Sequence, residues 1–124
     1  MIYLDTHVIV RLYQGEVERV GAAALEAIES NDLVVSPVVV LELEYLHEIG
    51  RLRVDAQTVV EALAGEVGLK VCDLAFGKVV EQALLEKWGR DPFDRLIVAQ
   101  ARVRAAMLAT GDERIRANYS GSIW

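Results

Sequence analysis

Short apolar stretches alternate with segments of helical periodicity along the chain, and this alternation limits the folds that it can adopt. Strands are predicted where the short apolar runs occur, at residues 2–4, 33–35, 70–72 and 108–110. Repeated alternation of strands and helices is typical of parallel strands joined by right-handed crossovers, with helices on both faces of the sheet. We therefore predict an α/β fold, a three-layer α/β/α sandwich around a central, mainly parallel sheet.

The expected helices are bounded by residues that favour helix ends. Ser36 followed by Pro37 is typical of a helix start, and Gly50 of a helix stop. Helices are expected at residues 17–29, 37–49, 55–63, 76–88 and 91–107, with shorter ones after Thr6 and after Asp112. The strand that begins at residue 2 is expected at the centre of the sheet, and residues 120–124 are either a tail or an edge strand.

The length and composition of the chain favour one compact domain over residues 1–124. Hydrophobic residues make up 53% of the sequence and charged residues 26%, a composition that fits disordered and fibrous classes poorly. The longest apolar runs are far shorter than the roughly 20 residues that span a bilayer, and no leader segment opens the chain. The single cysteine, Cys72, fits a reducing compartment and is expected to be buried. We therefore expect a soluble, cytoplasmic protein.

The net charge of −6 argues at first against nucleic acid as a partner. The acidic excess is uneven, however, because residues 1–62 carry 11 acids and 4 bases, whereas residues 63–124 carry 8 acids and 9 bases. Arginine accounts for 10 of the 13 bases, and its guanidinium suits bidentate contact with phosphate. Arg95 and Arg114 lie close in sequence to candidate site residues and could bind substrate; the alternative is a solvated helix face.

Four acidic residues occupy positions that a parallel sheet could bring together. Asp5 and Asp112 follow the first and last central strands, and ligands of such folds bind outside the carboxyl ends of the strands. Glu42 and Asp94 lie on helices among apolar neighbours, where an unpaired carboxylate is costly. Carboxylate oxygens suit Mg²⁺ or Mn²⁺. As alternatives, Asp5 and Asp112 are simply helix caps, and Glu42 is simply exposed to solvent.

Four segments together resemble a known family. They are LDTHVIV at residues 4–10, SPVVVLELEYL at 36–46, RDPFDRLIVAQA at 90–101 and ATGDERI at 109–115. In this order they resemble the PIN domains, and within them the VapC-type toxins of prokaryotic toxin–antitoxin pairs. The third segment is the most specific of the four, and the segments are distributed over nearly the whole chain. One position is looser, because Val39 stands where the family often has a hydroxyl residue.

The resemblance implies a Mg²⁺- or Mn²⁺-dependent endoribonuclease in which Asp5, Glu42, Asp94 and Asp112 hold metal. It further implies that a metal-activated water attacks the phosphodiester and leaves a 5′-phosphate. Thr6 and Thr110 match hydroxyl positions that orient the neighbouring carboxylates. A cognate antitoxin and a homodimer are implied as partners. The alternative is a PIN-fold module that has lost cleavage and only binds protein or RNA.

Two neighbouring acids need separate interpretations. Asp91 precedes Pro92, which predicts that Asp91 is the N-cap, in a supporting role, and that Asp94 at the third helical position is the metal ligand. The helix N-terminus should favour ionised Asp94, whereas four clustered carboxylates should raise the pKa of at least one of them. His7 and His47 lie on separate predicted helices, and structural or surface roles are expected for both. A phosphotransfer receiver fold is disfavoured, because it needs a late lysine and the last one is Lys87.

Overall fold

The computed structural model describes all residues, 1–124, and contains five strands. In chain order the elements are β1 (Ile2–Leu4), α1 (Thr6–Tyr13), the 3₁₀ helix η1 (Val17–Arg19), α2 (Ala22–Glu29), β2 (Leu33–Val35), α3 (Pro37–Glu48), α4 (Ala56–Val67), β3 (Lys70–Val71), α5 (Phe76–Ala83), α6 (Pro92–Val103), β4 (Met107–Ala109), α7 (Glu113–Asn118) and β5 (Ser122–Ile123). None of these helices is long and apolar enough to cross a membrane.

The strands form one sheet in the order β3-β2-β1-β4-β5, and every pairing is parallel. β1 is the central strand, as its position at the start of the chain predicts; Tyr3 lies opposite Val34 of β2 and Leu108 of β4. β5 pairs with β4, so the last residues form an edge strand rather than a tail. The predicted α/β fold with a parallel sheet is confirmed.

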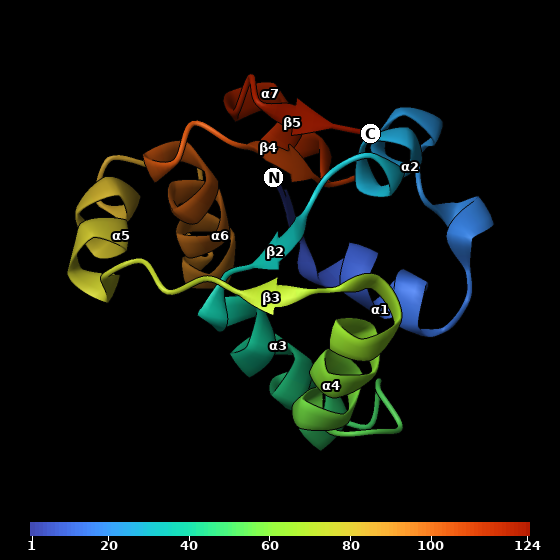
Figure 1. Cartoon of the computed structure of the whole chain (residues 1–124). Coiled ribbons are helices and arrows are strands. Elements are labelled where there is room, and N and C mark those ends of the chain that lie inside the picture. Colours follow the sequence, from blue (N-terminus) through green and yellow to red (C-terminus); the bar gives the residue numbers. More distant parts are fainter.

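The path of the chain places helices on both faces of the sheet (Figure 1). From β1 to β2 and on to β3 the chain moves in one direction, with α1, α2 and α4 on one side of the sheet. It then returns across β2 and β1 to β4, and α5 and α6 of this connection pack together on the other side (Figure 1). The direction in which strands are added therefore reverses between β1 and β4, and such a switch point opens a crevice at the carboxyl ends of the strands.

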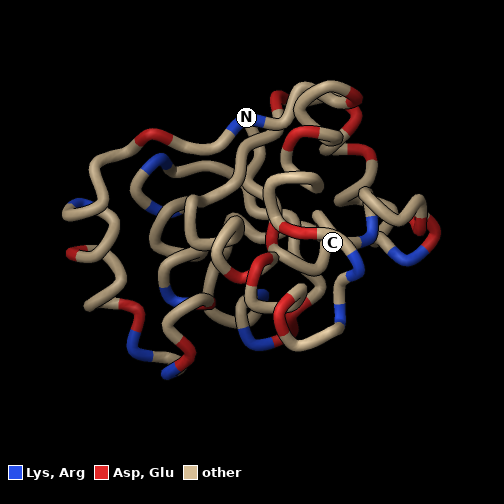
Figure 2. Tube along the Cα trace, turned by 90° about the horizontal axis from the view of Figure 1, so that it is seen from below, with Lys and Arg blue, Asp and Glu red and all other residues tan.

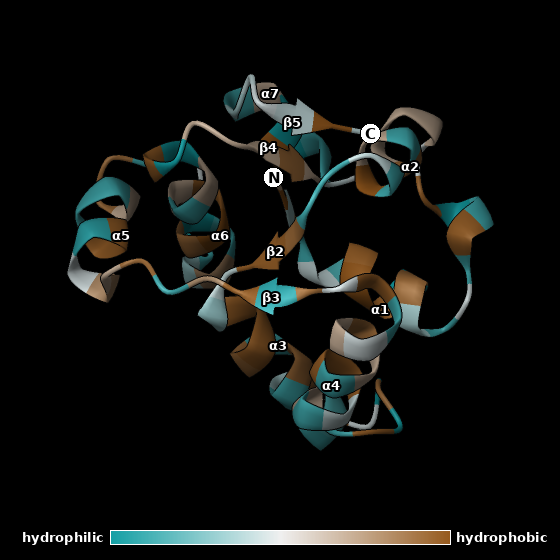
Figure 3. Cartoon of the chain, in the orientation of Figure 1, coloured by the Kyte–Doolittle hydropathy of each residue, from teal (hydrophilic) through white to brown (hydrophobic).

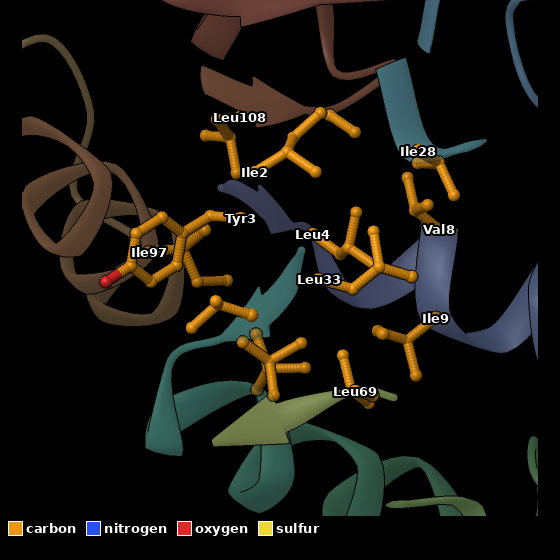
Figure 4. Packing of buried hydrophobic residues seen from close by; sticks show 14 of the residues in the cluster. Ile2, Tyr3, Leu4, Val8, Ile9, Ile28, Leu33, Leu69, Ile97 and Leu108 are labelled. Carbon is orange, nitrogen blue, oxygen red and sulfur yellow. The ribbon is translucent and has the colours of Figure 1, made fainter. Parts of the chain in front are cut away.

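The core is built around β1, whose side chains alternate between the two faces. Tyr3 points toward Ile97 of α6, whereas Leu4 lies on the side of Val8 in α1 (Figure 4). The Tyr3 hydroxyl lies 3.0 Å from Sγ of Cys72, which is buried as expected. Figure 3 shows β2 and much of α3 in brown, whereas α4 and α5 carry both brown and teal residues. The central strand is therefore clamped between two apolar layers.

Helix ends differ from the sequence-based expectation where distant contacts intervene. The segment 17–29 divides into η1 and α2, and Gly21 between them lies against Trp124. α5 ends at Ala83 rather than at residue 88, and the next residues turn Glu86 inward, where Trp88 and Arg102 bind its carboxylate. α6 ends at Val103, four residues early, because the chain turns at Ala105, whose φ is 49°. α4 runs four residues longer than expected, to Val67, and Gly68 then ends it with a φ of 71°.

Candidate active site

A hollow of about 510 Å³ opens at the carboxyl edge of the sheet, and we call it the acidic pocket. The pocket is lined by five carboxylates, Asp5, Glu42, Asp91, Asp94 and Asp112. They come from the ends of β1 and β4, from α3 and from the start of α6. Figure 2 shows acidic segments from separate parts of the chain meeting near the middle of the molecule. The structure thus brings all four predicted ligands to the switch point of the sheet.

Asp5 is fixed where the segments after β1 and β4 meet. Its backbone N–H donates to the Ala109 carbonyl at 3.1 Å, which joins the two strand ends. The Thr110 hydroxyl donates to Asp5 Oδ2 at 2.6 Å, and Asp5 Oδ1 accepts the Thr6 N–H at 2.8 Å. The same Thr110 oxygen accepts the Asp112 N–H at 3.1 Å. Thr110 therefore holds the first and last acids in one geometry.

Glu42 reaches the pocket from α3 and is held by α1. The Thr6 hydroxyl donates to Glu42 Oε1, so Thr6 orients this carboxylate. Burial raises the pKa of Glu42 above its usual range against the opposing effect of the Thr6 hydrogen bond, and the charges of Asp5 and Asp91 raise it further. Val39, one turn before Glu42, is fully buried in the core, so the position that often carries a hydroxyl in similar sequences is used here for packing.

The two acids of the DPFD segment have different surroundings. Asp91 is the N-cap of α6, because its Oδ1 accepts the N–H groups of Phe93 at 2.8 Å and Asp94 at 3.3 Å. Asp94 makes no side-chain hydrogen bond within the chain; burial raises its pKa to about 7, with further increases from the charges of its acidic neighbours. Burial and repulsion therefore outweigh the helix N-terminus, and the expectation of an easily ionised Asp94 is wrong. The expectation of at least one raised carboxyl pKa is confirmed.

The acids surround the pocket without converging on one point. No three histidine, cysteine, aspartate or glutamate side chains are arranged as a ready-made set of metal ligands. The donors nevertheless fit a hard divalent cation, because they are carboxylate oxygens that crowd one another when no cation is bound. Cys72 is buried in the core and His47 bonds the Leu52 carbonyl, so neither offers a soft ligand to this pocket.

A family model of the PIN domain matches residues 2–120 of the chain. The protein belongs to the PIN domain family. Among solved structures it is similar to a toxin–antitoxin complex from Klebsiella pneumoniae, with a TM-score of 0.72 and 17% identity over 100% of this chain and 97% of that one. It is also similar to VapBC2 from Rickettsia felis bound to a promoter DNA fragment, with a TM-score of 0.61 and 18% identity over 94% and 92%. No curated protein matches.

The arginines that line the acidic pocket of this PIN domain are not the ones expected from the sequence. Arg11 and Arg19 line the pocket, whereas Arg95 and Arg114 do not. Arg95 donates from Nε and Nη2 to the Ala83 carbonyl, at 3.1 and 2.7 Å, and so ties α6 to α5. Arg114 extends past Gly89 on the surface.

Sequence reasoning also missed His7, which forms part of the pocket wall. Its Nε2 accepts the Gly111 N–H at 2.8 Å, and Nδ1 lies 3.5 Å from Asp5 Oδ2. Burial lowers the pKa of His7, although nearby acids oppose this, so the neutral ring accepts at Nε2 and carries its proton on Nδ1. Helical spacing was the available signal, because His7, Val10, Arg11 and Gln14 recur at intervals that place them on one face of α1.

Proposed function

We propose that this PIN domain is a Mg²⁺- or Mn²⁺-dependent endoribonuclease that hydrolyses RNA phosphodiester bonds. The observation that carries the proposal is the gathering of Asp5, Glu42, Asp94 and Asp112 around one pocket at the switch point of the sheet. Membership of the family supports it, because PIN domains are generally nucleases. We take residues 1–124 as one domain that acts in the cytoplasm.

The four candidate ligands offer only oxygen donors, and the Nε2 lone pair of His7 is occupied by the Gly111 N–H, so the site favours Mg²⁺ or Mn²⁺ over Zn²⁺. When bound, such an ion polarises the phosphoryl oxygen and lowers the pKa of the attacking water. Asp5 and Asp112 are aligned through Thr110, and Thr6 orients Glu42. The side chain of Asp94 has no hydrogen-bond partner in the chain, so a bound cation would stabilise the ionised form of this carboxylate more than that of the others.

The partner assignments are part of the same proposal. Both similar structures are described as toxin–antitoxin or VapBC assemblies, which supports a toxin role with a cognate antitoxin. We also propose a homodimer, because large apolar side chains remain exposed on α3 and around α5: Leu41, Phe76, Leu84 and Leu85 are each more than 60% exposed. Light scattering after gel filtration tests the dimer, and growth arrest on expression, relieved by co-expression of a candidate antitoxin, tests the toxin role.

Cleavage of a mixed single-stranded RNA pool tests the enzymatic proposal. The chain should cut RNA with Mg²⁺ or Mn²⁺, and cutting should stop in EDTA and in Asp94→Asn. A matched control is Asp32→Asn, which removes the same charge from an exposed residue just before β2, at the opposite edge of the sheet. Cutting that persists in chelator would reject the metal mechanism.

A second candidate function is a PIN-fold module that binds protein or RNA without cleaving it. The lack of three converging ligands favours this alternative. The two are separated by the melting temperature, because a cation that binds only the folded state raises it by mass action. No rise with Mn²⁺, together with no cleavage, would favour the binding module.

A further inference from the structure

A second hollow, of about 420 Å³, adjoins the acidic pocket, and we call it the side pocket. It is lined by His7, Arg11, Gly111, Asp112 and Trp124. Three of these residues, His7, Arg11 and Asp112, also line the acidic pocket, so the two hollows share one wall. A chain that lies across the acids can therefore extend into the side pocket.

Trp124 packs closely against two glycines, which leave room for it because they have no Cβ. A Cβ at Gly111 would lie 2.8 Å from the indole Cζ2, and one at Gly21 would lie 2.4 Å from the Trp124 backbone carbonyl carbon. Any other residue at these two positions would have to push Trp124 away. The His7 ring meets the indole edge-on, with 5.6 Å between the ring centroids. Trp124 is nevertheless only partly buried, so part of the indole faces the side pocket.

Arg11 places a cation over the ring of the indole. Its Cζ lies 5.6 Å from the centroid of the Trp124 ring, and Nη1 donates to the Arg19 carbonyl at 2.7 Å. The remaining N–H groups of the Arg11 guanidinium have no hydrogen-bond partner in the chain. Arg11 makes no ion pair, whereas Arg19 is bonded to Glu16 at 2.7 Å. Arg11 is therefore the cation on this wall that is ready to bind an anion.

We propose that the side pocket is a nucleotide subsite, in which Arg11 turns away from the indole face to bind the phosphate of a nucleotide and Trp124 stacks on the base of the same nucleotide. The inference rests on the proposed nuclease function and adds to it how a strand is held beside the acids. A strand that crosses five carboxylates needs a cation nearby, and Arg11 supplies it. Stacking on an aromatic side chain tolerates any base, so the subsite holds single strands without reading their sequence.

Binding of a fluorescein-labelled single-stranded RNA decamer tests the proposal. The Asp94→Asn background is used with Mg²⁺, so that the RNA stays intact while anisotropy is recorded. Trp124→Leu, which keeps an apolar side chain but has no stacking face, should weaken binding roughly 5- to 100-fold. Trp124→Phe should stay within about threefold of the parent, because it retains a stacking face. Arg11→Gln should weaken binding and reduce its salt dependence by about one phosphate contact.

Trp88→Phe is the matched control, because Trp88 lines neither pocket and its Nε1 donates to Glu86 instead. This variant leaves Trp124 as the only tryptophan, so quenching of its fluorescence by the unlabelled RNA reports stacking directly. Quenching keeps the test decisive even if Trp124→Leu fails to fold. A folded Trp124→Leu that binds within twofold of the parent, or an unquenched Trp124 at saturating RNA, overturns the subsite.

Cleavage kinetics separate failure of the subsite from failure of the nuclease. If the unmodified chain cuts RNA and Trp124→Leu leaves KM unchanged, the subsite is wrong and the nuclease stands. If the chain never cuts RNA yet RNA quenches Trp124, the subsite stands without the proposed reaction. If RNA is neither cut nor able to quench Trp124, both proposals are rejected. A rise in KM with little change in kcat for Trp124→Leu supports both.

Discussion

Asp94→Asn should stabilise the protein in the absence of metal, which is unusual for a change in an active site. Burial and four neighbouring carboxylates raise the pKa of Asp94 to about 7, so its ionised form is disfavoured in the folded chain. Because the pKa is higher in the folded than in the unfolded chain, protonated Asp94 favours folding at low pH. This contribution is lost as the pH rises through 7. Asparagine keeps the shape of the side chain and never ionises, so its advantage grows as the pH rises from about 4 to 7 and is complete above pH 7.

The magnitude follows from the distance between the ordinary pKa of 3.8 and the value of about 7. In a fully enclosed group this difference would correspond to about 4 kcal/mol. Asp94 is partly open to water, and solvent screening reduces the figure to about 1 to 2 kcal/mol. For a chain of this size, Asp94→Asn should therefore raise the melting temperature by about 3 to 10 °C at pH 8 and by much less at pH 5.

Thermal unfolding in EDTA at pH 5 to 8.5 measures this effect, with Asp32→Asn as the control for net charge. Saturating Mn²⁺ should then reverse the order of the two proteins, because it stabilises the unmodified chain by mass action and has little effect on Asp94→Asn. A variant that is less stable than the parent at pH 8 would refute the reasoning. So would a gain that does not depend on pH or that Asp32→Asn reproduces.

The remaining predictions concern neighbouring contacts. Asp91→Ala should lower the free energy of unfolding by about 0.5 to 2 kcal/mol, measured by urea unfolding. Asp91→Ser retains an N-cap, so it should keep the stability of the unmodified chain and most of its cleavage in an RNA assay. Thr110→Val removes the hydrogen bonds to Asp5 and Asp112 from a fully buried position, and should cost about 1 to 3 kcal/mol and weaken Mn²⁺ binding in calorimetry. Glu86→Gln leaves Arg102 unpaired and should cost about 2 to 4 kcal/mol in urea unfolding, with RNA cleavage per folded molecule unchanged. Mn²⁺ affinity should rise up to about tenfold per pH unit between pH 5 and 7, because the ion displaces the proton of Asp94; a flat calorimetric profile would contradict this.

Local patterns predicted four of the five strands to within one residue and indicated which acids line the pocket, but they did not predict the helix ends. β1 and β2 are apolar runs whose limits agree with the structure, because each is buried on both faces. The end of α5 depends instead on Glu86, whose carboxylate is bound by Arg102 from α6, 16 residues later. Burial alone would raise the pKa of Glu86, but hydrogen bonds from Arg102, Trp88 and Gln82 hold it below its usual value. The residue pattern within one helix cannot predict a contact of this kind, because the partner lies on another helix.

The same limit explains why the arginines of the pocket were misassigned. Arg95 follows Asp94 directly, but neighbouring residues on a helix point about 100° apart, so Arg95 faces α5 while Asp94 faces the pocket. Arg11 was hidden for the opposite reason, because it lies six residues after Asp5 and reaches the acids only through the direction of α1. Closeness in sequence is therefore a poor guide to which arginine lines an acidic pocket. The face of the helix on which the arginine lies is a better guide.

Capping and metal binding, which appear as alternatives for Asp5 and Asp112 in the sequence, are compatible in the structure. Asp112 caps α7 through Oδ1, which accepts the Ile115 N–H at 3.0 Å, and its Oδ2 has no hydrogen-bond partner in the chain. Asp5 likewise uses Oδ1 for the Thr6 N–H, while its Oδ2 meets the Thr110 hydroxyl. A carboxylate has about four lone-pair sites, so a cap occupies one and leaves others for a cation. The capping hydrogen bond also fixes the side-chain rotamer of the aspartate, so the start of the helix orients the carboxylate toward the pocket.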